Sequence, residues 1–121
     1  MQIAYVNVFV RDVEAAVAFY RDVLGLPLEM SSPEHGYASF RAGEVRLGLA
    51  VAGEEQADLI GRHTGVGLAV DDLAAEHERL AATGVVFPMA PTRQPWGGFM
   101  AMLSDPDGKI FYLDQVAEMH G

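Results

Sequence analysis

The sequence predicts an α+β fold of two tandem βαβββ modules, whose strands form a curved mixed sheet with a concave cup and whose helices lie outside. A β-rich run, a capped helix and several short strands occur twice along the chain. A shift of sixty residues superimposes Val8 on Leu68 and Asp12 on Asp72. Neither half is long enough to bury its sheet face alone, so the repeat predicts two sheets side by side in a single domain.

The first module is predicted at residues 1–52, and it opens with a strand at residues 3–10. Successive side chains of a strand point to opposite faces. The valines of this strand therefore share the face turned to the helix, and Tyr5, Asn7 and Phe9 share the face turned to the cup.

A helix follows the first strand. Asp12 is placed to accept hydrogen bonds from its first turn, and Gly25 is placed to end it. The apolar residues recur at helical spacing and predict the buried side of this helix. These residues are Val13, Val17, Tyr20 and Leu24.

Short strands are predicted at residues 26–30, 37–41 and 45–51, and a linker at residues 53–63. The last of these strands alternates between an apolar face, which must meet the helix, and a second face turned to the cup. Its cup-facing residues are Arg46, Gly48 and Ala50.

The second module is predicted at residues 64–121 and repeats this order. Its first strand turns only Gly65, Gly67 and Ala69 toward the cup. Glycine is unfavourable inside strands, so two glycines at alternate positions suggest that room is needed above the sheet. A helix at residues 73–82 and a short strand at residues 85–88 follow.

The chain closes on a predicted hairpin with strands at residues 99–103 and 110–113. The connecting Asp105-Pro106-Asp107-Gly108 has the residue preferences of a type I turn in order. Trp96 lies just before this hairpin. Its indole is either a stacking platform for a ligand or a cap on one end of the core.

The composition of the chain excludes several classes of function. The chain has 8 basic and 17 acidic residues, and the resulting charge of −9 argues against nucleic-acid binding. It contains no cysteine, so disulfides, thiolate metal sites and cysteine nucleophiles are excluded. No apolar run approaches the roughly 18 residues of a membrane span, and no leader pattern is evident. We therefore expect a cytoplasmic protein.

The duplication, the run Phe19 to Leu26 and the Asp-Pro-Asp-Gly turn together resemble the vicinal oxygen chelate superfamily. This superfamily contains glyoxalase I, extradiol dioxygenases, fosfomycin resistance enzymes and bleomycin resistance proteins. The resemblance covers almost the whole chain. It implies the fold given above, and for the enzymes a divalent metal held in the cup by His, Glu or Gln from equivalent strands of the two modules.

The resemblance assigns four positions to these metal ligands. They fall on Tyr5, Gly48, Gly65 and Tyr112. A neutral phenol binds a divalent ion poorly, and glycine has no side chain to offer. We therefore expect no metal and no other cofactor in the cup.

The four histidines offer no obvious replacement, because no His-x-x-x-His pair or Glu-x-x-His cluster occurs. His77 is expected to pack, half-buried, on the second helix, while His35 lies in a predicted loop and His120 in the tail. His63 lies two residues before Gly65, so it keeps a metal role open.

Without a metal, the cup itself is the candidate site. Arg46 is expected either to meet a carboxylate or phosphate of a ligand or to pair with Asp114 or Glu44. Tyr5 and Phe9 offer stacking faces, unless they lean across and fill the space as ordinary core. The predicted ligand-binding residues are Tyr5, Asn7, Phe9, Arg46, Gly48, Gly65, Gly67, Trp96 and Tyr112.

The resemblance thus favours a metal-free binding protein similar to the bleomycin resistance branch, which sequesters a small planar or aromatic molecule. One alternative is a glyoxalase-like or dioxygenase-like enzyme with atypical active-site residues. A scaffold whose cup is closed is another. Members of this superfamily commonly pair their modules within or between chains, and a twofold homodimer is expected here.

Overall fold

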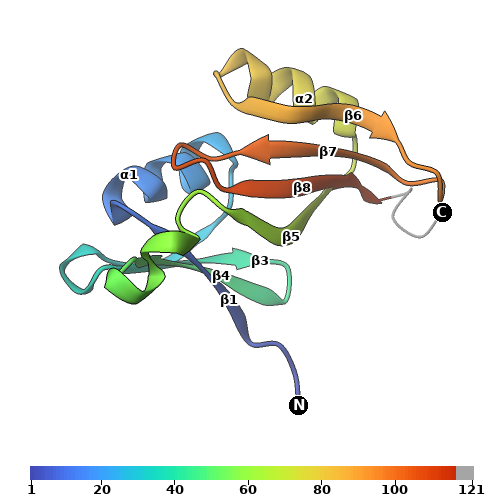
Figure 1. The fold of residues 1–121 in the computed structure, drawn as a ribbon. Helices are drawn as coiled ribbons and strands as arrows, with labels where there is room; N and C mark the ends of the chain where they lie inside the picture. Colours follow the sequence, from blue (N-terminus) through green and yellow to red (C-terminus); the bar gives the residue numbers. More distant parts are fainter. Residues whose placement is uncertain (117–121) are drawn as a thin grey trace. The chain divides into compact units, whose positions relative to one another are not determined.

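The computed structural model describes residues 1–116 and contains two compact units, Met1–Gly61 and Arg62–Gly121. Each unit is one mixed four-stranded sheet with a helix packed on one face (Figure 1). The strand orders are β1-β4-β3-β2 and β5-β8-β7-β6, so both units have the same topology. The predicted α+β fold of two βαβββ repeats is confirmed.

The first unit follows the predicted order of elements. Strands β1 and β4 lie side by side and run parallel, and the remaining neighbouring strands run antiparallel. The elements are β1 (Tyr5–Val10), α1 (Val13–Ala18), β2 (Leu28–Ser32), β3 (Tyr37–Ala42) and β4 (Val45–Val51).

The first helix begins and ends where the sequence predicts. Asp12 Oδ1 accepts the backbone N–H of Glu14 at 3.0 Å, and Gly25 adopts a φ of 81° after the last turn. From Phe19 to Val23 the helix widens into a π-helical turn. The predicted regular spacing is therefore interrupted, and the wider turn accompanies the burial of two consecutive aromatic residues, Phe19 and Tyr20.

The core of the first unit lies between its sheet and this helix. The rings of Tyr20 and Phe40 lie 6.0 Å apart, centroid to centroid, and both residues are fully buried. Val8, Val10 and Leu49 are buried on the same face of the sheet. The predicted alternation of β1 and β4 is confirmed by this burial.

The second unit repeats the arrangement, with α2 packed against strands β6, β7 and β8 (Figure 1). The predicted strand at residues 85–88 is part of a longer β6, and the predicted linker contains a short 3₁₀ helix, Glu54–Leu59. The elements are β5 (His63–Val70), α2 (Leu73–Ala82), β6 (Val86–Arg93), β7 (Phe99–Ser104) and β8 (Ile110–Gln115).

His77 on α2 packs as predicted, half-buried with its ring 4.5 Å from that of Phe87. The core of this unit includes Leu73, Leu80 and Phe111. Across residues 1–116, none of the helices is long and apolar enough to cross a membrane.

The turn between β7 and β8 has the predicted geometry. Gly108 donates its backbone N–H to the carbonyl of Asp105 at 2.9 Å. Oδ1 of Asp105 accepts the backbone N–H groups of Asp107 and Lys109 at 3.0 and 2.8 Å. The turn is therefore held by one aspartate side chain as well as by its backbone.

Candidate functional site

The sheet of the first unit has a face that turns away from α1. The side chains of β1, β4 and β3 form rows across it, set by the strand register. One row runs Tyr5, Arg46, Arg41; the next runs Asn7, Gly48, Ser39; the third runs Phe9, Ala50, Tyr37. Five of the predicted ligand-binding residues therefore lie together on this face.

Gly48 allows two polar side chains to approach the sheet closely. A Cβ atom at this position would overlap Oδ1 of Asn7 and lie 2.7 Å from the hydroxyl oxygen of Tyr37. The missing side chain thus leaves room for the Asn7 amide and the Tyr37 hydroxyl rather than an empty place. Tyr37 was not among the predicted site residues, and its place opposite Ala50 follows only from the register.

Two arginines on this face share one carboxylate. Oε2 of Glu29 accepts from Nη2 of Arg41 at 2.8 Å, and Oε1 of the same carboxylate accepts from Nε of Arg46 at 3.2 Å. The hydrogen bond from Arg41 lowers the pKa of Glu29, and the charge of Arg46 adds to the effect. Arg46 is thus held by Glu29, not by Glu44 or Asp114 as the sequence suggested.

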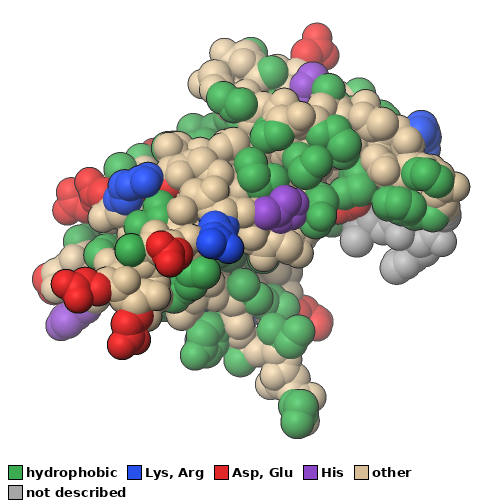
Figure 2. All heavy atoms as spheres, viewed as in Figure 1, with side chains coloured by type: hydrophobic (Ala, Val, Ile, Leu, Met, Phe, Trp, Pro, Cys, Tyr) green, Lys and Arg blue, Asp and Glu red, His purple; other side chains and the backbone are tan. Residues whose placement is uncertain are grey.

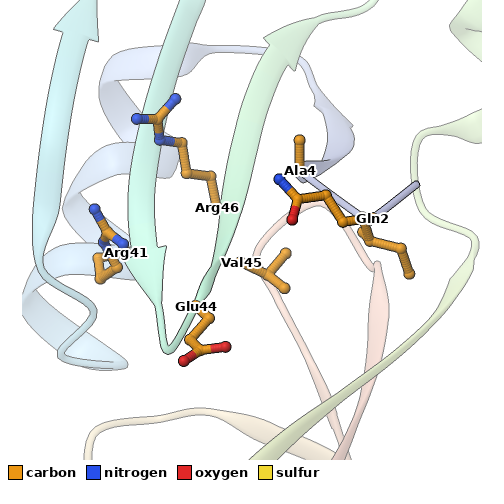
Figure 3. Close-up of a pocket in the computed structure, with 7 residues that line it drawn as sticks. Gln2, Ala4, Arg41, Glu44, Val45 and Arg46 are labelled. Carbon is orange, nitrogen blue, oxygen red and sulfur yellow. The ribbon is translucent and has the colours of Figure 1, made fainter.

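A hollow of about 510 Å³ lies in the first unit, where β1 begins and the β3–β4 turn ends (Figure 3). The guanidinium groups of Arg41 and Arg46 point to one side of it, and the carboxylate of Glu44 points away from them. The hollow is lined by Gln2, Ile3, Ala4, Arg41, Glu44, Val45 and Arg46.

The corresponding face of the second unit is apolar. Strand register aligns Met89 of β6, Met102 of β7, Tyr112 of β8 and Gly67 of β5 in one row. Figure 2 shows hydrophobic side chains gathered over β7 and β8 with a histidine beside them. Methionine adapts its shape and packs well on aromatic rings. The two methionines were not among the predicted site residues, because the sequence predicted only short strands here and no faces were assigned to them.

A bulge in β5 changes which residue borders β8. His63 pairs with Ile110 and Gly67 pairs with Tyr112, so β5 carries two more residues between these pairs than β8 does. Gly65 lies in this bulge with a φ of 73°, a conformation that L-residues rarely adopt. Its lack of a side chain is explained by the backbone, not by a need for room above the sheet.

The same bulge positions His63. Its Nδ1 accepts the backbone N–H of Gly65 at 3.0 Å, and its ring lies 4.6 Å from that of Tyr112, centroid to centroid. Accepting at Nδ1 leaves the proton of the neutral imidazole on Nε2. His63 therefore stands beside one of the positions predicted for a metal ligand.

Gly67 faces the same side of the sheet as Tyr112, with Asp114 close by. A Cβ atom at Gly67 would lie 3.2 Å from Oδ2 of Asp114. Burial raises the pKa of this carboxyl above its ordinary value of 3.8. The face therefore combines an apolar row with one partly buried carboxyl group.

Trp96 lies in the loop before β7, and its residue surface is 61% exposed. A Cβ atom at Gly98 would lie 2.6 Å from its indole Nε1, so the ring lies over that glycine. A cap on the core would be buried. The core-cap interpretation is therefore wrong, and the indole is an accessible aromatic surface.

The residues at the four expected metal positions do not fit a divalent ion. Gly65 is displaced into the bulge, Gly48 lies beneath Asn7 and Tyr37, and His63 has one ring nitrogen engaged by backbone. In the part of the chain that the structure describes, no group of three or more His, Asp or Glu side chains could hold a metal ion. His120 lies outside the described residues.

Comparison with known proteins agrees with this architecture. The family model described as Glyoxalase/Bleomycin resistance protein/Dioxygenase superfamily matches residues 2–111. The protein YraH of Bacillus subtilis (strain 168) is 30% identical, over 93% of this chain and 97% of its own. A putative glyoxylase, CFP32 of Mycobacterium tuberculosis, is 34% identical over 81% of this chain, which spans only 38% of that relative.

Solved structures give the same result. TnmS3, an antibiotic binding protein from Streptomyces sp. CB03234, is 31% identical with a TM-score of 0.81, and the match covers 95% of each chain. A superfamily member from Sphaerobacter thermophilus is 25% identical with a TM-score of 0.83, over 95% of this chain and 97% of that one.

Proposed function

Because this chain belongs to the glyoxalase/bleomycin resistance protein/dioxygenase superfamily, we propose that it is a binding protein for a small planar or aromatic molecule and works without a catalytic metal. The observation that carries this proposal is the set of residues at the four metal positions, which offers two phenols and two glycines. The similarity to the antibiotic binding protein TnmS3 supports it.

Within each unit, the sheet face that turns away from the helix offers a surface for such a ligand. Tyr5 is 58% exposed and Trp96 61%, so both offer aromatic surface without displacing core side chains. Tyr112 and its methionine neighbours supply apolar surface in the second unit. A mostly apolar lining with a few polar anchors is typical of small-molecule sites.

A second candidate, a glyoxalase-like enzyme with atypical residues, is supported by the similarity to the putative glyoxylase CFP32. The two candidates differ in metal content and in turnover. A thermal-shift screen against planar antibiotics and metabolites, run beside elemental analysis, separates them. Stabilisation by a planar compound in metal-free protein supports binding, whereas one bound Zn, Ni, Mn or Fe per chain with conversion of a substrate supports the enzyme.

We further propose that the protein works in the cytoplasm. We also propose that it forms a twofold homodimer, since closed twofold symmetry is the commonest oligomeric form.

A further inference from the structure

The arginine pair of the first unit has more hydrogen-bond donors than Glu29 uses. Glu29 takes the Nε–H of Arg46 and leaves the four terminal N–H donors of that guanidinium for another acceptor. It also takes Nε–H and one Nη2–H of Arg41. One carboxylate between two guanidinium groups leaves a net charge of +1, in a chain whose overall charge is −9.

Glu29 also holds the two arginines in place. Its side chain is 26% exposed, while those of Arg41 and Arg46 are 51% and 60% exposed. An arginine already fixed by one carboxylate loses less side-chain entropy when it binds a second. The pair is therefore preorganised for an oxyanion, and its exposed side is open to one.

The hollow supplies the space for that oxyanion. Both guanidinium groups lie on one side of it, and Figure 3 shows the amide of Gln2 across from Arg46. Glu44 lines the hollow at the β3–β4 turn, with its carboxylate turned away from the arginines. This second acid disfavours a group with two negative charges, so the site suits a single charge.

An aromatic side chain stands next to the arginine. Tyr5 is the direct register partner of Arg46 on the neighbouring strand β1, and neighbouring strands lie about 4.8 Å apart. A planar molecule resting on the exposed ring of Tyr5 would place a substituent within reach of Arg46. A flat carboxylate matches the fork of the guanidinium group.

From this arrangement we infer that the ligand is an aromatic carboxylic acid, with its ring on Tyr5 and its carboxylate on Arg46 beside Arg41. The inference rests on the proposed binding function and names the chemical class of its ligand. The carboxylic acid of the ligand is the group that the first unit recognises.

The test uses the full-length protein and three probes of one shape: naphthoate, its neutral amide naphthamide, and naphthyl phosphate. Isothermal titration calorimetry should show naphthoate binding about two- to fivefold tighter than naphthamide, as expected for an exposed charge pair. The preference should shrink as salt is added. Naphthyl phosphate should bind more weakly than naphthoate, and tighter binding would assign the site to phosphate and overturn the inference.

Three variants test which residues cause the preference for naphthoate over naphthamide. Arg46→Gln should bind naphthoate and naphthamide equally, and Tyr5→Ala should weaken both. Arg79→Gln is the matched control, because Arg79 is similarly exposed at 47% and pairs with Glu76 on α2. It should keep the preference, and circular dichroism should show all three variants folded.

Equal binding of the two compounds by the wild type, or a preference that survives Arg46→Gln, overturns the inference and leaves the proposed function standing. Failure of both compounds to bind at millimolar concentration also overturns it. The proposed function is judged separately by the broad screen of planar compounds, whose complete failure would count against binding of any planar ligand.

Discussion

Nζ of Lys109 lies 2.7 Å from Oδ2 of Asp105, and both side chains are almost completely buried, at 1% and 2% exposure. Replacing Lys109 by Met would remove the cation that pairs with the buried Asp105 carboxylate. We expect Lys109→Met to lower the free energy of unfolding by about 3 kcal/mol. Urea denaturation followed by circular dichroism measures this loss.

The double variant Asp105→Asn with Lys109→Met is the control for that loss. An Asn side chain can still accept the backbone N–H groups of the turn but carries no charge. It should recover part of the stability lost by Lys109→Met. A double variant as unstable as the single one would show that the loss comes from packing and not from the unpaired charge.

Gly48→Ala is expected to displace the amide of Asn7 and the hydroxyl of Tyr37, because its Cβ would occupy their place. Both groups end flexible side chains, so the cost is that of forcing other rotamers, about 1 kcal/mol. Adding Asn7→Ala should recover some of it in a double-mutant cycle. Strictly additive losses would mean that the two residues do not compete for this space.

Gly67→Leu tests the ligand face of the second unit. Gly67 does not have a positive φ, and its nearest neighbour is the end of the Asp114 side chain, so the fold should tolerate leucine. The larger side chain should cover the row beside Tyr112 and abolish binding of a ligand found in the screen. Ala74→Leu, exposed on α2, is the control and should bind normally. Unchanged affinity of Gly67→Leu, or its unfolding, would show that the face is wrongly assigned.

Asp114 gives a pH-dependent prediction. Burial raises the pKa of its carboxyl in the folded state above 3.8, so the folded protein binds this proton more tightly than the unfolded chain. Stability is therefore lost as the pH rises from below 3.8 through the folded-state pKa. Asp114→Asn should raise the melting temperature at pH 7, and this gain should vanish below pH 3.8. Asp71→Asn, at an exposed position, is the control for the loss of one surface charge.

The homodimer is tested by sedimentation equilibrium at working concentration. A twofold pair predicts a species of twice the 13.1 kDa chain mass. A single species of 13.1 kDa across the concentration range would contradict it.

The fold could be predicted because local signals agree. Alternation separates the buried Val8 from Asn7 on β1, and the Asp-Pro-Asp-Gly turn forms through Asp105 as expected. The exposure of Trp96 could not be predicted, since aromatic residues beside Pro and Gly occur both in cores and on loops.

The site was predicted less completely, because irregularities in strand pairing shift the register. The shift of sixty residues aligned Tyr5 with Gly65, but the bulge in β5 brings His63 to the ladder position beside Ile110. A second irregularity, between Leu28 and Met30, accompanies the pairing of Glu29 with Arg41 and Arg46. A regular repeat predicts equal spacing in equivalent strands and therefore does not reveal either insertion. For this reason the ion pairs of Glu29 with Arg41 and Arg46 were not predicted.

The bulge in β5 also limits how this chain could evolve metal chelation. A single codon change from Gly65 to His would place an imidazole on a left-handed backbone that lies outside the strand ladder. Position 65 would reach the ladder place that His63 now holds only if two residues of β5 were removed. A point substitution at position 65 is therefore a poor way to give this strand a metal-chelating side chain.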